Sequence, residues 1–382
     1  METICITGMG MVTSLGLDVR TCCAAARAGI VRPTEIDTFP VRSPEDGEIS
    51  GLMVHVVPML TEGFEGQARL QRLTTAALKD LVHQTVHAPW KQGSTAFYLS
   101  LPDPRRVYTG FGLISDEEER KEKEEEAREI LAEPLDEEWA HALLTKAAQL
   151  SGWPDKPDLR FIATSGNTGV AQALRKAMEE LKTGTIDVGV VGGVDSLLDE
   201  ATLAWLENTH RLKTPDMPVG LQPGEAAAFF TVEIVRESSA AKAKALAGIQ
   251  AVHMGTEART LLSGEPSLGE GLAVLMMRLV DGGNANGQVP WFITDQNGEF
   301  SRAMEWGNAV VRMIENWPVL GEAVLWYPAM SFGDTGAATG AVAACMAMRA
   351  FEQGYAPAGK SPIIISSADG VSRAALFLKN LK

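Results

Sequence analysis

Two short turns carry the residues whose positions could support chemistry. Asn167-Thr168-Gly169 and Asp334-Thr335-Gly336 each follow an apolar strand pattern and precede a helical stretch, and they recur a little under half the chain apart. The first residue of each turn would lie at the N-terminus of a buried helix, where backbone N–H groups and the helix dipole favour a nucleophile or an anion. Neither an amide nor a carboxylate is a good nucleophile here. The simplest interpretation of Asn167 and Asp334 is therefore helix capping, and the alternative is a polar pocket for a small molecule.

The other reactive residue types form no recognisable centre. The histidines are scattered and predict no metal site, and the cysteines show neither a metal-binding spacing nor a disulfide framework, which favours a reducing cytoplasm. They are His55, His83, His87, His141, His210 and His253, and Cys5, Cys22, Cys23 and Cys345. The glycines of residues 8–16 lack the dinucleotide-binding spacing, and we expect them to form a turn that lets a strand and a helix pack closely. The sequence predicts no cofactor.

Strands and helices alternate along the whole chain, which is typical of parallel or mixed sheets covered by helices. Strands are predicted at 4–7, 96–101, 159–164, 187–191, 225–233, 249–254, 289–294 and 363–365. Helices are predicted at 18–28, 69–81, 170–182, 269–279, 304–315 and from the Asp334 turn to about Phe351. Because the strand–turn–helix–strand pattern appears twice, we predict two copies of one α/β unit that face each other across a pseudo-two-fold axis.

One segment, from Asp116 to Arg128, differs from the rest of the chain in holding eight acidic and four basic side chains. Pairs of opposite charge four residues apart predict a solvated surface helix or a flexible insertion, and a dedicated docking surface is the sharper alternative. We predict an N-terminal half of residues 1–235, with a charged helical insertion at about 112–150, and a C-terminal half of residues 236–382.

Composition limits the classes of partner. At 382 residues with 45% hydrophobic content, the chain can bury a large core. A net charge of −15 argues against nucleic acid or an anionic membrane surface as a main partner. The first residues lack a basic segment and read as a strand rather than a signal peptide, and no apolar run approaches the span of a bilayer. We expect a cytoplasmic protein that binds neither nucleic acid nor membranes.

Five segments in order along the chain resemble the motifs of the β-ketoacyl synthase branch of the thiolase-fold family. They are the opening strand and glycine turn 5–16, the strand 187–196 with its Gly-Gly, the loop 220–230 with Pro-Gly-Glu, the turn and helix 333–341, and the closing turn and strand 366–376. The resemblance covers nearly the whole chain. It implies an α/β thiolase-like fold in which two pseudo-two-fold-related βαβαβ halves stack in five layers (αβαβα), with the two repeat helices in the middle layer.

The family's chemistry uses a cysteine thiolate and two histidines, and this sequence lacks all three. The cysteine position falls on Asn167, one histidine falls on Asp334, and the nearest match to the other is Asn297 before Gly298. No histidine follows His253. An amide cannot carry an acyl group as a thiolate does, and a carboxylate cannot donate a hydrogen bond to an oxyanion unless it is protonated. The resemblance therefore implies a protein without condensing activity and without catalytic residues.

The closing turn also departs from the family pattern. Asp369 stands where an apolar residue is usual, and Arg373 stands where an asparagine is common.

Three functions are open at this point. The first is a non-catalytic binding partner or adaptor in a protein complex, either free-standing or similar to the chain-length-factor partners of ketosynthases. The second is an enzyme with other chemistry, with Asp334 or Asp295 as a base. The third is a protein that binds acyl-CoA or an acyl-carrier protein without turnover. The family resemblance also implies a homodimer, or a heterodimer with a ketosynthase-like partner, formed through the strand at 159–164.

Overall fold

The computed structural model describes residues 2–43, 47–85, 88–91, 93–114, 116–132, 134–236, 244–283, 289–357 and 360–381. The strands are β1 (Glu2–Thr13), β2 (Thr34–Arg42), β3 (Ile49–Val54), β4 (Thr95–Ser100), β5 (Leu159–Ala163), β6 (Val188–Ser196), β7 (Glu225–Arg236), β8 (Ala247–Thr256), β9 (Trp291–Thr294), β10 (Val324–Trp326), β11 (Pro362–Ser367) and β12 (Ser372–Lys379). The α-helices are α1 (Val19–Arg27), α2 (Gly66–Gln84), α3 (Glu117–Ala132), α4 (Glu138–Ser151), α5 (Gly169–Lys182), α6 (Glu200–Asn208), α7 (Glu270–Asp281), α8 (Phe300–Met313), α9 (Ala329–Phe332) and α10 (Thr339–Gln353).

In the described part of the chain, two five-stranded halves join into one long sheet. The strand order is β10-β9-β11-β12-β8-β1-β7-β6-β4-β5. The halves meet between β1 and β8, through the pairs Cys5↔Gly248 and Ile6↔Ala247 only. In each half three strands are parallel and two run antiparallel to their neighbours. The predicted pair of similar mixed sheets is confirmed.

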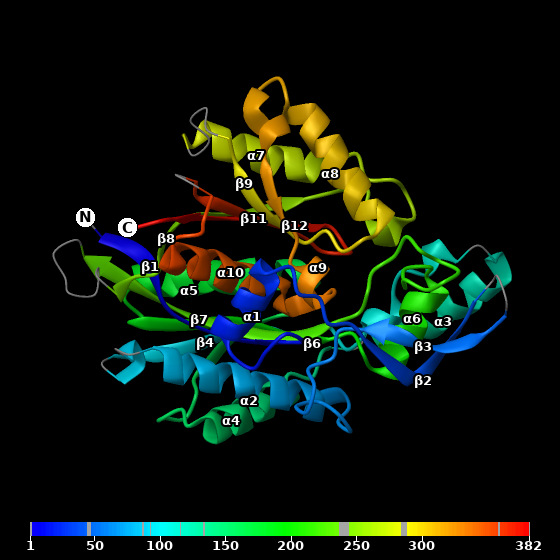
Figure 1. Cartoon of the computed structure of the whole chain (residues 1–382), viewed down its shortest axis with the longest axis horizontal. Helices are drawn as coiled ribbons and strands as arrows, with labels where there is room; N and C mark the ends of the chain where they lie inside the picture. Colours follow the sequence, from blue (N-terminus) through cyan, green and yellow to red (C-terminus); the bar gives the residue numbers. More distant parts are fainter. Residues whose placement is uncertain are drawn as a thin grey trace.

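The two halves stack as five layers (Figure 1), as the sequence predicts. Helices α2 and α4 cover the outer face of the N-terminal half, α7 and α8 cover the outer face of the C-terminal half, and α1, α5 and α10 lie between the sheets. Side chains of a strand point alternately to opposite faces of the sheet, so β4 contributes to the hydrophobic cores on both of its faces. Ala96 and Tyr98 join the middle core, whereas Phe97 and Leu99 join the outer core under α2 and α4.

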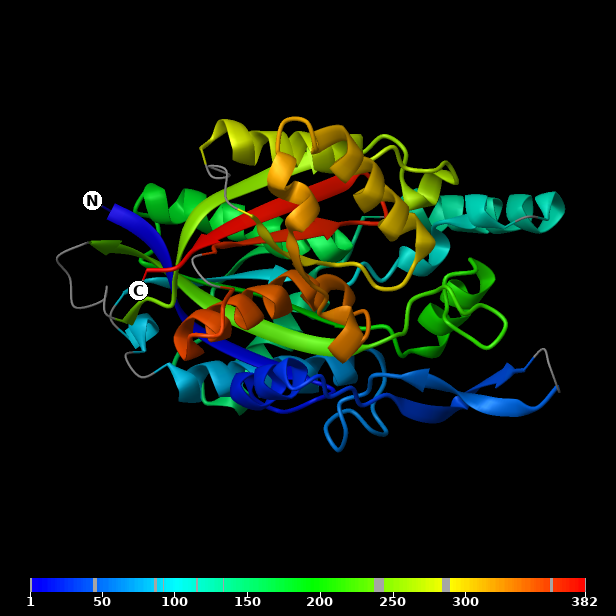
Figure 2. The same cartoon turned by 45° about the horizontal axis from the view of Figure 1, so that its top comes forward.

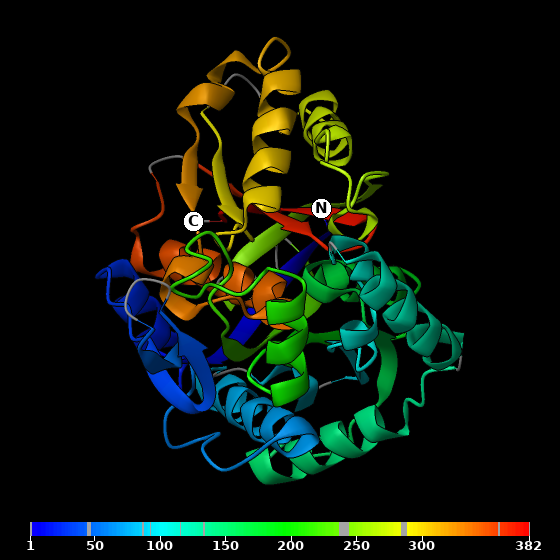
Figure 3. The same cartoon turned by 90° about the vertical axis from the view of Figure 1, so that its right-hand side faces the viewer.

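Small residues allow the middle layer to close. Helix α10 is rich in alanine and almost fully buried. A Cβ atom on Gly193 would lie 2.3 Å from the carbonyl oxygen of Ala337, and one on Gly340 would lie 3.0 Å from Val170. These glycines therefore serve the close approach of β6, α5 and the start of α10. Viewed from the end that carries α3 and α6, the C-terminal half lies above the N-terminal half with α10 between them (Figure 3).

The expected glycine turn after the first strand is wrong at Gly8 and Gly10. Strand β1 continues through both residues to Thr13 and pairs with β7 along its length. A Cβ atom on Gly10 would lie 2.3 Å from the backbone nitrogen of Leu81. The glycines permit close packing between strand and helix, as expected, but they do so inside a strand, where local sequence alone would favour a turn.

Two elements project from the same end of the molecule (Figure 2). One is the ribbon of β2 and β3, which the sequence analysis missed. The other is α3, the charged segment, which is a solvated helix with only Ala127 buried. Asp116 accepts hydrogen bonds from the backbone N–H groups of Glu118 and Glu119 and so caps α3. Helix α4 differs from α3 because it is amphipathic and packs against α2.

Strand β7 ends at Arg236, next to the boundary that the sequence predicts at residue 235, and that division of the chain stays a prediction. Among the described residues, every helix is too short or too polar to cross a bilayer.

Candidate functional site

The two repeated turns meet in the middle layer, as the sequence predicts. Each forms a short 3₁₀ turn, Gly166–Thr168 before α5 and Gly336–Ala338 before α10, and the two turns are in contact. They open onto a cleft of about 310 Å³ that Asn167 and Asp334 both line. The two Asx residues are 6% and 5% exposed, so any chemistry at this position would occur out of bulk water.

Asn167 does not cap its helix, and that interpretation is wrong. No side chain caps the start of α5. Instead, Nδ2 of Asn167 donates to Oδ2 of Asp295, 3.2 Å away, from the other half of the molecule. Asp295 lies at the end of β9 and places a buried carboxylate beside this amide. The amide therefore bonds to Asp295 and not to the backbone N–H groups at the start of α5.

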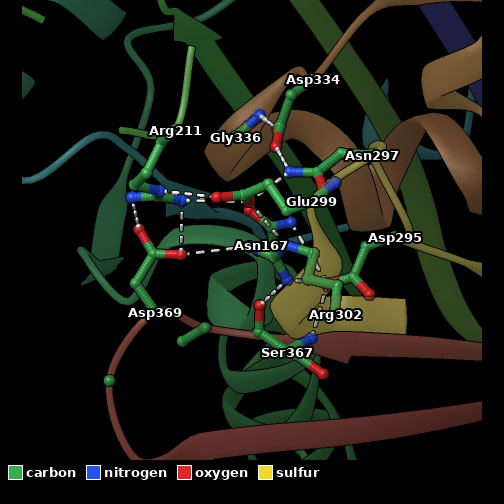
Figure 4. A network of polar contacts seen from close by, with 12 residues as sticks. Asn167, Arg211, Asp295, Asn297, Glu299, Arg302, Asp334, Gly336, Ser367 and Asp369 are labelled. Carbon is green, nitrogen blue, oxygen red and sulfur yellow. Dashed lines mark hydrogen bonds and ion pairs between the residues drawn. The ribbon is translucent and has the colours of Figure 1, made fainter. Parts of the chain in front are cut away.

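Asp334 does cap its turn, and it also contacts the third predicted position. Its Oδ1 accepts from the backbone N–H of Gly336 at 2.8 Å, and its Oδ2 accepts from Nδ2 of Asn297 at 2.6 Å. The same amide nitrogen donates to Glu299 at 2.7 Å. Through these bonds and those of Asp295 and Arg302, the three predicted positions 167, 297 and 334 belong to one connected site (Figure 4).

Arg302, at the start of α8, ties this site together. Its Nη1 lies 3.0 Å from Asp295 and donates to the carbonyl of Ser367, and its Nη2 lies 3.1 Å from Asp369 in the closing turn. Burial raises the pKa of Asp295, and the Arg302 guanidinium opposes that rise. The N–H of Ser367 and the amide of Asn167 oppose the rise as well, so three neighbours favour the charged form of Asp295.

Arg211 forms the second centre, between two carboxylates. It contacts Glu299 at 2.7 and 3.2 Å and Asp369 at 2.8 and 3.1 Å, both in bidentate fashion. Burial alone would raise the pKa of Glu299 and of Asp369, but the guanidinium of Arg211, with help from Arg302, lowers both. The ring of Trp205 covers Arg211 from one side, with 5.0 Å between guanidinium and ring centroid.

A third arginine, Arg106, follows β4 and contacts Asp195. Its Nη1 lies 2.8 and 3.0 Å from the two oxygens of Asp195, which also accepts from the backbone N–H of Ala337 at 2.9 Å. Burial raises the pKa of Asp195, and Arg106 and the backbone donors oppose the rise. Asp195 thus holds the backbone N–H of Ala337 in the turn before α10.

The arginines that make up this site were not predicted from the sequence. Asp295 was named as a candidate base, and Asp369 was named as a departure from the family pattern. Arg106, Arg211 and Arg302 gave no signal, because they lie on three separate loops or helix starts that only the fold brings together.

The site is rich in charge. Three guanidinium groups face five carboxylates, which belong to Asp195, Asp295, Glu299, Asp334 and Asp369. No cysteine or histidine of the described chain lines the cleft. All four thiols are buried elsewhere; burial raises the pKa of Cys22 to about 12 and that of Cys345 well above its usual value. Such thiols are poor nucleophiles. No cluster of metal-binding side chains occurs among the residues that the structure describes.

No protein-family model matches the chain, and no curated protein sequence matches it. Solved structures do. A structure titled "The ishigamide ketosynthase/chain length factor" matches with a TM-score of 0.66 at 19% identity, and both chains are covered completely. A complex of a type II polyketide acyl-carrier protein with its ketosynthase, AntDE:AntF, matches with a TM-score of 0.71 at 13% identity, again over both full chains. A β-ketoacyl synthase from Burkholderia phymatum STM815 matches at 0.67 and 16%, also over both full chains.

These likenesses extend from end to end, and they agree with the five-layer arrangement and the central position of α5 and α10. At such low sequence identities, these structural matches show the fold of the chain and do not show its activity. The chain has the thiolase fold in the form that ketosynthases adopt.

Proposed function

We propose that this chain is a non-catalytic protein of ketosynthase fold that acts by binding another protein, as a partner or adaptor in a complex. The observation that carries the proposal is the content of the cleft. Where the family has a thiolate and two hydrogen-bond donors, this chain has Asn167, Asn297 and Asp334, each hydrogen-bonded to a neighbour. Its cytoplasmic location is part of the same proposal.

The chemistry of these groups supports the proposal. An amide such as that of Asn167 is neither nucleophilic nor readily deprotonated, so it gives no acyl-enzyme. Asp334 accepts hydrogen bonds through both oxygens, so it offers an oxyanion repulsion rather than stabilisation. The loss of one group could leave a partial reaction such as decarboxylation, whereas the loss of all three leaves none.

The arginine–carboxylate pairs support it in a second way. In a condensing enzyme the cleft must admit a thioester. Here the closing turn is held by Asp369, which pairs with Arg211 and Arg302, and the buried Arg373 pairs with Glu305 and donates to three carbonyls of the same turn. Ion pairs of this kind are costly to open once formed. The closing turn is therefore held in place and does not readily move aside for a thioester.

The proposal is tested by incubating the protein with acyl-CoA and acyl-carrier protein and then measuring its intact mass, with an active ketosynthase as the positive control. We expect no adduct. A stable acyl adduct, or release of carbon dioxide from a malonyl donor that Asn167→Ala or Asp334→Ala abolishes, would show that the chain is an enzyme with unusual chemistry.

A partner is identified by copurification from the native host and mass spectrometry, followed by reconstitution from purified components. We expect a defined stoichiometric complex. An absence of any complex, with a monomeric chain, would contradict the adaptor role.

A chain-length-factor role is the second candidate, and the match to a ketosynthase/chain length factor over both full chains favours it. In that case the partner is an active ketosynthase, joined along β5, and an acyl-carrier protein is a further partner. Coexpression with a ketosynthase from the same genome distinguishes the two candidates. A stable heterodimer supports the chain-length-factor role, and its absence beside another bound protein supports the free-standing adaptor.

A further inference from the structure

The turn that leads into α8 contains an asparagine followed directly by a glycine, Asn297-Gly298. The side-chain amide of an asparagine can be attacked by the backbone nitrogen of the next residue, because the attack closes a small, unstrained ring. Glycine is the next residue that hinders this attack least, since it has no Cβ atom. The sequence holds one more pair of this kind, Asn286-Gly287, which lies outside the described residues. The pair at 297 thus contains both partners of a reaction within the chain.

The fold leaves the backbone nitrogen of Gly298 available for this attack. Gly298 is exposed to solvent, and its N–H has no hydrogen-bond partner in the described part of the chain. Its φ of +102° favours glycine, and a Cβ atom there would lie 2.7 Å from the carbonyl oxygen of Gly220. The structure therefore requires glycine at 298, and with it an unhindered backbone nucleophile.

The carbonyl end of the Asn297 amide faces a hydrogen-bond donor. Its Oδ1 accepts from the backbone N–H of Glu299 at 3.1 Å. Glu299 is the N-cap of α8, so this oxygen lies at the helix end where the dipole favours negative charge. An attack on Cγ turns Oδ1 into an oxyanion, and a preorganised N–H at this distance stabilises that charge.

The nitrogen end of the same amide contacts two carboxylates. Nδ2 of Asn297 donates to Oε2 of Glu299 at 2.7 Å and to Oδ2 of Asp334 at 2.6 Å (Figure 4). Nitrogen leaves carbon only after it gains a proton, and a carboxylate can pass on the proton that Gly298 loses. A nucleophile, an oxyanion donor and a proton relay therefore surround one carbon atom, Cγ of Asn297.

We propose that Asn297 is a self-modification site, at which the chain slowly converts this amide into a carboxylate without another protein. The nitrogen of Gly298 bonds to Cγ, the Cγ–Nδ2 bond breaks, and Nδ2 leaves as ammonia with the proton from Gly298. Water then adds to one of the two carbonyls of the resulting succinimide and breaks its bond to the ring nitrogen. The product is aspartate or isoaspartate at 297. A backbone nitrogen is a weak nucleophile, so the rate depends on proximity and on the groups around the amide.

The conversion changes the polar network of the cleft. Glu299 and Asp334 both lose the donor that Nδ2 supplies, and a third carboxylate takes its place between them. Like charges at this distance disfavour each other's ionised form, so we expect the modified protein to be less stable than the original. The inference concerns a covalent change in the chain itself. It goes beyond the proposed function and does not depend on it.

Peptide mapping by mass spectrometry tests the proposal on the full-length protein, incubated at neutral pH in the native state and in urea. The rate in urea reflects the local sequence alone, and conversion of Asn286 in the same unfolded sample confirms that the conditions permit the reaction. We expect Asn297 to become aspartate and isoaspartate in the native protein at least as fast as in urea. Slower conversion in the native protein would mean that the fold protects the amide, and this result overturns the proposal.

Hydroxylamine cleaves a succinimide and so gives a second readout. The native wild type should be cut between residues 297 and 298. Asn297→Gln is the matched control, because it keeps an amide whose cyclisation needs a larger ring and is much slower. This variant should lose the cut at 297 and keep any cut after Asn286. A native wild type without the cut, or equal cleavage of the variant at this position, contradicts the proposal.

The expected effect on the cleft is measured with Asn297→Asp, which reproduces one product. It should melt at a lower temperature than the wild type, whereas Asn297→Gln, which retains the donor, should lose less. A melting temperature of Asn297→Asp equal to or above that of the wild type would overturn the effect that we infer for the modification.

Discussion

Arg302 is the residue on which the polar network of the cleft depends most. It contacts Asp295, Glu299 and Asp369 and donates to the carbonyl of Ser367, so one side chain connects β9, α8, β11 and the closing turn. Its side chain is 9% exposed and those of Asp295 and Glu299 are 5% exposed, whereas that of Asp369 is 28% exposed. A buried ion pair adds little net stability over a well-packed apolar substitute, but removing one partner leaves the other charge unpaired and desolvated.

We therefore predict that Arg302→Ala lowers the free energy of unfolding by about 3–5 kcal/mol, measured by urea denaturation. The matched control is Arg312→Ala in the same helix. Arg312 is 43% exposed and pairs with an exposed glutamate, so its removal should cost less than about 1 kcal/mol. Similar costs for the two variants would mean that the network does not hold the closing turn.

A second prediction at this scale concerns pH. The pKa of Asp295 is raised by burial above the unfolded value of 3.8. Its contribution to stability is thus greatest below that pH and is lost as the pH rises through the folded pKa. The pKa of Asp369 is lowered by Arg211 and Arg302 against the effect of burial, so its contribution is present above pH 3.8 and is lost as the pH falls through the folded pKa.

The two carboxylates should therefore give opposite pH slopes. Relative to the wild type, Asp295→Asn should gain stability as the pH rises from about 4. Asp369→Asn should lose stability relative to the wild type as the pH rises toward 3.8 from below. Chemical denaturation at a series of pH values measures the free energy of unfolding of both variants. The slope of that free energy against pH does not include the pH-independent loss of stability that each substitution causes. Slopes of the same sign would contradict the charge states that we assign to the cleft.

At the scale of the elements, the close approach between β6 and the start of α10 fixes the position of the cleft. Gly193 in β6 lies against the carbonyl of Ala337, and two residues later Asp195 accepts from the N–H of the same residue. A strand and a turn from opposite halves are thus held by one steric contact and one hydrogen bond.

We predict that Gly193→Ala destabilises the fold by about 1–3 kcal/mol, since its Cβ has no room and the neighbouring atom is backbone. Gly307→Ala is the matched control, because the same change occurs in open space and should stabilise the monomer. Thermal unfolding of the two variants under identical conditions makes the comparison. Shifts of the melting temperature in the same direction would show that the packing of the middle layer is looser than described.

At the scale of the whole molecule, the long sheet ends in two exposed edges, β10 and β5. Strand β10 has three residues and offers little to pair with. Strand β5 has five residues, is only partly buried, and is the strand that the sequence analysis selected as a dimer edge. An unprotected edge strand tends to pair with another chain.

We predict that light scattering gives the mass of a dimer, formed through β5 with a second copy or with a homologue from the host. A monomer, with no heteromeric partner from the host, would contradict pairing along β5.

The sequence by itself determined the architecture and the position of the site. Periodicity located most strands and helices, and the two Asx-Thr-Gly turns marked where α5 and α10 begin, because the residues that start a buried helix next to a strand are chosen by local geometry. That the family's nucleophile is absent stays a prediction from the sequence, which depends on the residues at 167, 297 and 334.

Only the tertiary structure decided what the cleft contains. Asn167 would cap its helix if local contacts prevailed, but the other half of the molecule supplies Asp295, and a buried amide bonds to the carboxylate that reaches it. Arg106 and Arg211 gave no signal along the chain because their partners are dozens of residues away. Arg302 lies seven residues from Asp295, but its other partner, Asp369, is 67 residues away. Gly8 and Gly10 resemble a turn and form a strand, because β7 and α2 supply pairing and packing that no local pattern records. Contacts between distant segments are set by the fold as a whole.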